Sequence, residues 1–254
     1  MTIQYASDLH LEFQANWRYL QANPIVPSAD ILLLAGDTHY MVEDMKAHPF
    51  FDWAAEAFEQ VFLIPGNHEY YGGFDAKIAL EEEYEVQFRD NVFLLNNATR
   101  TIGDTRIIFS TLWSKVVREA VAVYRGMYDF RLIHFRGEKF NIEHYNQLFE
   151  LSWAYVQNTL AKAHEGKTIV MTHHLPSNHC IMPKYKGSSL NEGFCTDLSD
   201  YILDCAADYW IYGHSHGNRN AFEIGKTTLL TNQLGYVDMS EHFDFDRKAV
   251  IDLS

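Results

Sequence analysis

The sequence predicts an α/β protein in which short buried strands alternate with longer amphipathic helices. Four apolar runs, rich in β-branched or aromatic residues, are hydrophobic on both faces, as is typical of strands in a covered sheet: residues 31–35, 61–64, 168–172 and 209–212. Three longer segments between them carry apolar residues at helical spacing: residues 50–60, 74–89 and 142–164. This alternation favours helices layered against a sheet.

The remaining segments complete this organisation. Residues 1–6 form a plausible first strand, and two segments predict antiparallel hairpins, with Gly103-Asp104 and Gly225-Lys226 at their turns: residues 98–110 and 220–231. Residues 113–140 have weak periodicity and many Tyr, Phe, Arg and His side chains, which indicates an irregular, cap-like excursion over the surface. No repeat or linker-like stretch interrupts the chain, so we expect residues 1–254 to form a single domain.

The composition is that of an acidic globular protein. Of its 254 residues, 47% are hydrophobic and 21% are charged, which is enough apolar material for a large core. Twenty Lys and Arg against 34 Asp and Glu give a net charge of −14, which makes nucleic acid and anionic membranes unfavourable partners. The longest unbroken apolar stretch, residues 31–35, is far shorter than the roughly 20 residues of a membrane-spanning helix.

Two residue types narrow the chemistry further. Cys180, Cys195 and Cys205 are odd in number and form no C-x-x-C pair, so we expect reduced core thiols rather than disulfides or a structural zinc site. The chain has 13 histidines, and histidine is the side chain that most often binds metals. The positions of these histidines therefore decide which function the sequence favours.

Polar clusters follow each of the predicted buried strands. They are Asp8-Leu9-His10, Gly36-Asp37, Gly66-Asn67-His68-Glu69, His173-His174 and Gly213-His214-Ser215-His216. Ligands of open α/β sheets bind beyond the carboxyl ends of the strands, so we expect the five clusters to converge on one rim. Gly66 and Gly213 directly precede cluster side chains, and we expect them to adopt the positive φ that glycine tolerates.

The side chains of these clusters predict a metal site. Asp, His and Asn without Cys form an oxygen and nitrogen donor set, which suits Mn, Fe, Zn or Mg better than a metal selected by thiolates. There are enough donors for two ions, and the two carboxylate oxygens of Asp37 could bridge them. Two ions roughly 3.5–4 Å apart stabilise both the attacking and the leaving oxygen of an in-line displacement.

The ordered motifs D-x-H, G-D, G-N-H-E, H and G-H-x-H resemble the calcineurin-like metallophosphoesterase family over most of the chain. The resemblance implies two packed mixed β-sheets flanked by helices, a four-layer αββα sandwich, with a binuclear metal centre between the sheet ends. Residues 127–133 and 232–236 also resemble one small bacterial branch of the family. That branch usually has Pro-Arg where this chain has Gln233-Leu234, so a cation that could face a phosphate is missing here.

The resemblance also implies roles for individual residues. Two ligand groups share one aspartate: Asp8, His10, Asp37 and His216 for one ion, and Asp37, Asn67, His173 and His214 for the other. His68 would not be a ligand but a catalytic residue, which stabilises charge in the transition state and protonates the leaving oxygen. The nucleophile would be a hydroxide that bridges the two metal ions. We expect manganese as the metal, with iron, zinc and magnesium as alternatives.

Two further residues are candidates for contact with the substrate. Arg131, in the excursion, could supply positive charge to a phosphate, and His174 adjoins a proposed ligand. We expect a cytoplasmic protein, because cleavage of a signal peptide of roughly 15–30 residues would remove Asp8 and His10.

Together these observations predict a metal-dependent phosphoesterase that acts on a small phosphodiester. The net charge of −14 disfavours long polyanions, whereas a metal pair would attract a compact phosphoester. A phosphomonoester is the alternative substrate, and a non-catalytic partner-binding protein of the same fold is the alternative function. A barrel-type metal hydrolase is a further alternative, but it would have a His-x-His motif near the start of the chain, where this chain has Asp8-Leu9-His10.

Overall fold

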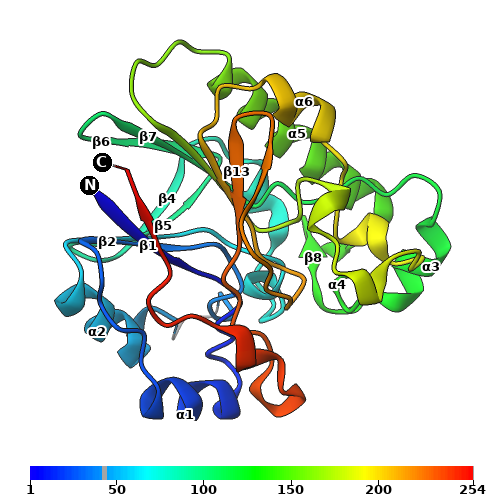
Figure 1. Cartoon of the computed structure of the whole chain (residues 1–254). Helices are drawn as coiled ribbons and strands as arrows, with labels where there is room; N and C mark the ends of the chain where they lie inside the picture. Colours follow the sequence, from blue (N-terminus) through cyan, green and yellow to red (C-terminus); the bar gives the residue numbers. More distant parts are fainter. Residues whose placement is uncertain (42–44, 254) are drawn as a thin grey trace.

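In the computed structural model of the protein, two mixed sheets of six strands each lie face to face (Figure 1). The structure describes residues 1–41 and 45–253. The first sheet has the order β14-β1-β2-β3-β5-β4, and its strands are β1 (Thr2–Ala6), β2 (Ile31–Leu34), β3 (Gln60–Leu63), β4 (Tyr84–Arg89), β5 (Val92–Asn96) and β14 (Val250–Asp252). The second has the order β12-β13-β11-β10-β7-β6, and its strands are β6 (Ala98–Ile102), β7 (Thr105–Ser110), β10 (Thr168–Thr172), β11 (Tyr209–Ile211), β12 (Phe222–Ile224) and β13 (Thr227–Leu230).

The four central strands of each sheet run parallel, and an antiparallel strand lies at each edge. Because parallel strands end at the same edge of a sheet, the loops after β1, β2 and β3 leave the first sheet together. The loops after β10 and β11 leave the second sheet in the same way. The four predicted buried strands and both predicted hairpins are confirmed, the hairpins as β6–β7 and β12–β13.

Apolar side chains from both sheets form the core between them. Alternate residues of each strand point into this layer, as the two-residue period of a strand requires. They include Ile3, Ile31 and Phe62 from the first sheet and Ile107, Ile169 and Ile211 from the second, and all six are almost fully buried. The remaining faces of the strands carry a larger apolar cluster, which the helices cover.

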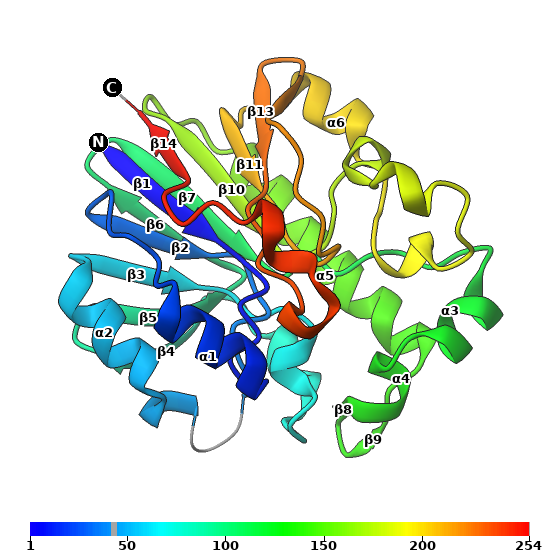
Figure 2. The same cartoon turned by 60° about the horizontal axis from the view of Figure 1, so that its bottom comes forward.

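Helices flank the two sheets on their outer faces (Figures 1 and 2). Next to the first sheet lie α1 (Gln14–Ala22) and α2 (Pro49–Ala57), and next to the second lie α5 (Ile142–Leu160) and α6 (Ser199–Asp204). α2 packs against β3, β4 and β5, and α5 packs against β7. The predicted sandwich of two mixed sheets flanked by helices is confirmed.

The prediction of a helix over residues 74–89 is wrong. A short 3-10 helix, Ala76–Leu80, is followed by the edge strand β4, which pairs with β5. Tyr84, Val86 and Phe88 alternate with Glu85, Gln87 and Arg89, which is the two-residue period of a half-buried strand. The other two predicted helices end earlier than expected, at Ala57 and Leu160, and α1, β5 and β14 have no counterpart in the sequence prediction.

The excursion of residues 113–140 is more ordered than the sequence predicts. It contains α3 (Ala120–Gly126), α4 (Asp129–Leu132) and a small hairpin of β8 (His134–Phe135) and β9 (Glu138–Lys139). Trp113, Phe130 and Phe140 pack their rings together beneath these elements, with centroids 5.6–5.8 Å apart in the contacting pairs. Trp113 also packs on Tyr70 and Tyr145, with ring centroids 5.8 and 5.2 Å away, and these contacts hold the excursion against the rest of the molecule.

The three cysteines are buried and free, as the sequence predicts. Among the described residues, we find no helix that is both long enough and apolar enough to cross a bilayer.

Candidate metal centre

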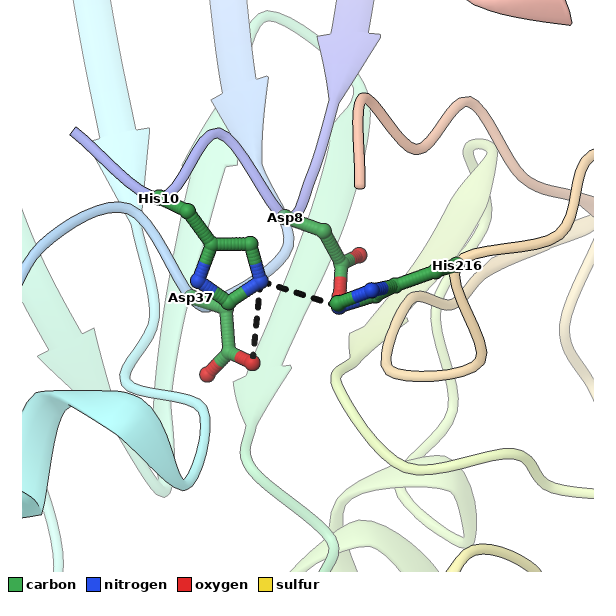
Figure 3. Close-up of side chains that lie close together, drawn as sticks. All are labelled: Asp8, His10, Asp37 and His216. Atoms are coloured by element: carbon green, nitrogen blue, oxygen red, sulfur yellow. Dashed lines mark hydrogen bonds and ion pairs between the residues drawn. The ribbon is translucent and has the colours of Figure 1, made fainter. Parts of the chain in front are cut away.

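The strand ends of both sheets bring the predicted polar clusters together. Three groups have potential ligand atoms that lie within 4.8 Å of one another, and one of them consists of His10, Glu12 and His68. The two groups that the motifs predict are Asp8, His10, Asp37 and His216 in one, and Asp37, His173 and His214 in the other. Asp37 belongs to both groups. Figure 3 shows the side chains of the first group, which come from three different loops and point toward one another. We refer to Asp8, His10, Asp37, Asn67, His173, His214 and His216 as the ligand cluster.

Three histidines of the ligand cluster present the same nitrogen to its centre. The Nε2 atoms of His10 and His216 lie 2.9 Å apart, and His10 Nε2 lies 3.8 Å from Asp37 Oδ2 (Figure 3). His173 Nε2 lies 3.3 Å from the same carboxylate oxygen. Asp8 completes the first group, with Oδ1 3.4 Å from His216 Nε2.

The other ring nitrogen of each of these histidines has a fixed partner. His10 Nδ1 donates to Glu12 Oε1 at 3.0 Å, and His216 Nδ1 donates to Glu241 Oε2 at 2.7 Å. His173 Nδ1 donates to the carbonyl of Ala35 at 2.9 Å. Partners of this kind hold a metal-binding imidazole in one tautomer and orientation. Each Nε2 lone pair is therefore directed into the ligand cluster.

The amide of Asn67 is oriented in the same way. Its Nδ2 donates to Tyr71 Oη at 2.9 Å and, at 3.4 Å, to Asp129 Oδ2. Tyr71 Oη in turn donates to Asp129 Oδ2 at 2.8 Å. The amide oxygen of Asn67 is left facing the cluster, 3.2 Å from His173 Nε2.

The donor set and its burial fit two divalent cations. Every donor is oxygen or nitrogen, which suits Mn, Fe, Zn or Mg. His214 Nε2 is buried and has no hydrogen-bond partner among the described residues, which would be costly for a polar atom with no other role. Asp37 lies between the two groups, and its carboxylate could serve both ions.

Opposite charges shift the pKa values inside the ligand cluster. Burial alone would raise the pKa of Asp37, but His173 and the other nearby histidines outweigh it and hold the pKa well below its usual range. Against the opposing effect of burial, Asp37 raises the pKa of His173 to about 9. Asp8 and Glu241 likewise raise the pKa of His216 to about 10. Cations that bind here would replace these protons, so binding should release protons.

The backbone of the ligand cluster is strained. Five of its residues have the positive φ that side chains other than glycine rarely adopt: Asp8 (54°), His10 (48°), Asp37 (53°), His214 (75°) and His216 (47°). Hydrogen bonds hold the first of these loops in place: Ser7 Oγ donates to Asp8 Oδ2 at 2.5 Å, and the backbone N–H of His214 donates to Asp8 Oδ1 at 3.0 Å. Backbone strain of this kind clusters at functional sites.

Gly66 and Gly213 are required for space and not for a positive φ. Neither has a positive φ, so that expectation is wrong. A Cβ atom at Gly66 would lie 2.2 Å from Asp37 Oδ1, and one at Gly213 would lie 2.7 Å from Asp8 Oδ2. Any side chain at these positions would displace the neighbouring carboxylate.

Glu69 joins the loops that follow β2 and β3. Its carboxylate accepts the backbone N–H groups of Asp37, Thr38 and Gly66 at 3.0, 2.8 and 2.7 Å. Glu69 is fully buried, so these three bonds replace the water that it loses. They hold the loop of Asp37 against the loop of Asn67.

Comparison with known proteins gives this arrangement a family. The profile of the calcineurin-like phosphoesterases matches residues 1–218, which takes in every residue of the ligand cluster. The chain belongs to this family. It is therefore a metal-dependent phosphoesterase by family, and the identification made from its motifs is confirmed.

The phosphoesterase also resembles individual proteins. It is 29% identical over 280 residues to the uncharacterized protein L509 of Acanthamoeba polyphaga mimivirus, across 99% of this chain and 96% of the viral protein. Its fold matches the crystal structure of the phosphopantetheinyl hydrolase PptH from Mycobacterium tuberculosis, with a TM-score of 0.66 and 17% identity over 92% of this chain and 89% of that one. TT1561 of Thermus thermophilus matches with a TM-score of 0.53 and 12% identity over 99% and 94% of the two chains. The two solved structures show that the fold is shared.

His68 stands beside the ligand cluster of this phosphoesterase. Its Nδ1 donates to Glu12 Oε1 at 3.0 Å, and its Nε2 lies 3.1 Å from Tyr236 Oη. Burial alone would lower the pKa of His68, but the carboxylates of Asp37 and Glu12 outweigh it and raise the pKa. His68 lines the cavity that opens over the cluster.

The two residues predicted to contact substrate lie elsewhere. Arg131 Nη2 donates to the carbonyl of Arg125, its guanidinium lies 5.4 Å from the centroid of the Tyr128 ring, and it does not line the described part of the cavity. His174 is fully buried and packs on the proposed ligand His214, with ring centroids 4.2 Å apart. Its Nε2 lies 3.0 Å from Tyr145 Oη, so it is placed to support His214.

Sequence reasoning missed the residues that orient the cluster: Glu12, Tyr71, Asp129, Tyr236 and Glu241. Glu12 follows His10 by two residues and extends the D-x-H pattern to D-x-H-x-E, a signal that could have found it. Tyr71 lies only four residues after Asn67. Asp129 and Tyr236 lie within residues 127–133 and 232–236, and only the fold brings them and Glu241 to the site.

Proposed function

We propose that this phosphoesterase is a binuclear enzyme that hydrolyses a small phosphodiester. The observation that carries the proposal is the position of Asp37 in both groups of potential ligands. A carboxylate shared by two groups of nitrogen and oxygen donors is the arrangement that a pair of divalent ions needs. The oriented imidazoles around it support the same interpretation.

We propose that the two ions share the ligand cluster in the way that the resemblance to the family implies. One ion would be held by Asp8, His10, Asp37 and His216, and the other by Asp37, Asn67, His173 and His214. We propose manganese as the metal. When bound, the pair would lower the pKa of water, so that a bridging hydroxide can serve as nucleophile, and would offset the charge of the phosphoryl oxygens.

His68 is proposed as the acid that protonates the leaving oxygen. Glu12 holds the Nδ1 proton of His68, which directs Nε2 toward the cavity and Tyr236. The raised pKa favours the protonated imidazole, the form that can give up a proton. The same positive charge would stabilise the negative charge that develops on the phosphoryl group.

A small diester fits the surroundings better than a long polyanion. The net charge of −14 would repel a polyphosphate backbone, and the cavity beside the cluster has a volume of about 360 Å³. PptH, named for the phosphopantetheinyl group that it hydrolyses, shares this fold. A phosphopantetheinyl group carries a phosphate, so the name of that relative is in line with a phosphoester substrate.

Metal add-back to the stripped protein tests the proposal. Mn, Zn, Fe and Mg are added in turn, and hydrolysis of bis(p-nitrophenyl) phosphate and of p-nitrophenyl phosphate is followed together with bound metal. We expect two ions per chain and restored turnover, with a higher kcat/KM for the diester. A higher kcat/KM for the monoester would overturn the diester assignment, and two bound ions without turnover of either ester would overturn the enzymatic one.

A further inference from the structure

The cavity over the ligand cluster has one polar wall, and its other walls are mainly apolar. Asp37, Asn67, His68, His214 and His216 form the polar wall. The lining also includes the apolar side chains that we call the apolar chamber: Met127, Leu175, Ile181, Met182, Leu190 and Phe194. Pockets of roughly 300–1,000 Å³ with such a lining are typical of sites for small organic ligands. At about 360 Å³ this cavity lies within that range.

Two segments far apart in the sequence build the chamber and contact each other. α3 and α4 of the excursion lie beside the loop of residues 175–194 in both views (Figures 1 and 2). A Cβ atom at Gly126 would lie 2.5 Å from Leu190 Cδ2, and one at Gly193 would lie 2.1 Å from Met127 Sδ. Glycines therefore let these two apolar side chains pack across the junction, which gives the chamber fixed walls.

Beyond the ligand cluster and His68, the described lining has no cation that would attract a second negative charge. No lysine or arginine is among the described residues that line the cavity. Apart from the ligand cluster and His68, its acidic or basic side chains are the carboxyl groups of Asp129 and Glu241. Asp129 is buried, and its Oδ1 has no hydrogen-bond partner among the described residues. Away from the ligand cluster and His68, an anionic substituent would lose its water and meet carboxyl groups instead of a cation.

Building on the proposed function, we propose that the second substituent of the phosphodiester is an uncharged, mainly apolar group that occupies the apolar chamber. The phosphate would bind at the ligand cluster, and the substituent would displace water from Met127, Leu190 and their neighbours. Selectivity among phosphodiesters would then arise from buried apolar area and not from a cationic clamp.

A series of p-nitrophenyl diesters that differ only in the second alcohol tests this inference. The alcohols are methyl, butyl and hexyl, together with a chain of hexyl length that ends in a carboxylate. From methyl to hexyl we expect kcat/KM to rise about tenfold or more, since each added methylene buries apolar surface. The carboxylate ester should fall at least tenfold below the hexyl ester.

The outcomes separate the two proposals. Equal kcat/KM for all alkyl esters, or a preference for the carboxylate ester, would overturn the apolar substituent while leaving the phosphodiesterase intact. Absence of metal-dependent hydrolysis for every ester would instead overturn the proposed function on which the inference rests.

Leu190→Ala locates the effect within the molecule. It shortens a chamber side chain that packs at Gly126, so the hexyl-to-methyl ratio of kcat/KM should fall at least threefold. Leu151→Ala, at an exposed position of α5 outside the described lining, is the matched control and should keep the wild-type ratio. An unchanged ratio in a Leu190→Ala protein that still unfolds cooperatively would contradict the assignment.

Discussion

The ligand cluster and the apolar chamber share one cavity but are built in different ways. The cluster stands on the ends of parallel strands, is almost fully buried, and has its imidazoles fixed by hydrogen bonds. The chamber stands on short helices and loops, and its apolar side chains are in part exposed. The difference indicates that the two sheets fix the positions of the polar side chains. The loops form a surface whose residues can vary with the substrate without disturbing those positions.

The largest effect should come from the carboxylate shared by the two ligand groups. Asp37→Asn keeps the shape of the side chain and an oxygen for the backbone N–H of His68, but it removes the charge between the proposed ions. We expect kcat to fall on the order of 10³-fold and bound metal to fall below two ions per chain. Hydrolysis assays and elemental analysis of the purified variant measure both.

Asp30→Asn is the control for that prediction. Asp30 is an exposed acid immediately before β2, at the opposite end of the strand from Asp37. It should keep wild-type metal content and turnover. If Asp37→Asn also kept wild-type metal content and turnover, the ligand cluster would not be the reactive centre. The contrast drawn between the ligand cluster and the apolar chamber would then be wrong.

Glu12→Gln should have the next largest effect. Glu12 accepts hydrogen bonds from His10 and His68, and its charge raises the pKa of His68. The amide removes that charge, so the pKa of His68 should fall. Activity that needs the protonated imidazole would then be lost at a lower pH.

We therefore expect the alkaline limb of the pH–rate profile to move to lower pH and kcat to fall roughly 10–100-fold. Profiles of the variant and of Glu56→Gln, an exposed glutamate on α2, provide the measurement and the control. An alkaline limb at the wild-type position would show that the Glu12 charge does not act through His68.

Tyr71→Phe tests whether the cavity wall next to the ligand cluster affects metal binding. Tyr71 Oη accepts a hydrogen bond from Asn67 and donates one to Asp129. Loss of its hydroxyl removes one hydrogen bond that orients the Asn67 amide. The affinity for one of the two ions should weaken about tenfold. Titration of the stripped protein with Mn would show this, and excess Mn should restore most of the activity.

The exposed Tyr124, on α3, gives the matched variant Tyr124→Phe, which should bind Mn as the wild type does. If both variants bound Mn equally well, the hydrogen bond from Asn67 to Tyr71 would not contribute to metal affinity. The ligand cluster and the rest of the cavity would then act independently.

The smallest effect is expected at a histidine outside both regions. His48 Nδ1 accepts the backbone N–H of Phe50 at the start of α2, and burial, together with His39, lowers its pKa to about 4. In the unfolded chain the pKa is near 6.5, so the unfolded state takes up the proton first on acidification. The stability that the neutral His48 contributes to the folded protein is therefore fully present above about pH 6.5, and it is lost as the pH falls toward 4.

His48→Asn keeps a capping acceptor without this titration. Between pH 7 and 5 its melting temperature should fall about 1–3 °C less than that of the wild type, since His48 is partly exposed and screened by solvent. Thermal scans at the two pH values measure the difference. Equal falls in both proteins would argue against a depressed pKa.

Much of the fold was predictable because the central strands carry their own signal. The apolar runs of β2, β3, β10 and β11 are buried on both faces, so nothing in their sequence competes with that assignment. The prediction failed at β4 because edge strands alternate: Tyr84, Val86 and Phe88 also fit helical spacing with the preceding residues, whereas pairing with β5 decided the structure. Local pattern alone does not contain that pairing.

The site residues also fall into those that a local sequence pattern reveals and those that only the tertiary fold brings together. The residues of the ligand cluster directly follow strands and could be found as motifs, and the structure brings them together at one place; their roles as ligands stay predictions until metal is measured. Asp129 lies 62 residues from Asn67, and Tyr236 lies 168 residues from His68, so no local pattern joins them. Arg131 is a candidate by its charge alone, and its own hydrogen bond holds it elsewhere.

The left-handed backbone at five positions of the ligand cluster limits which metal ions a redesigned site on this scaffold could bind. Besides glycine, the residues that tolerate this conformation best are Asn, Asp and His, and all five positions carry Asp or His. Exchanging these five residues for cysteine would add strain at each of the five positions, whereas exchange among Asp, Asn and His would not. The path of the main chain therefore favours hard and borderline metals over thiophilic ones before any side chain is chosen.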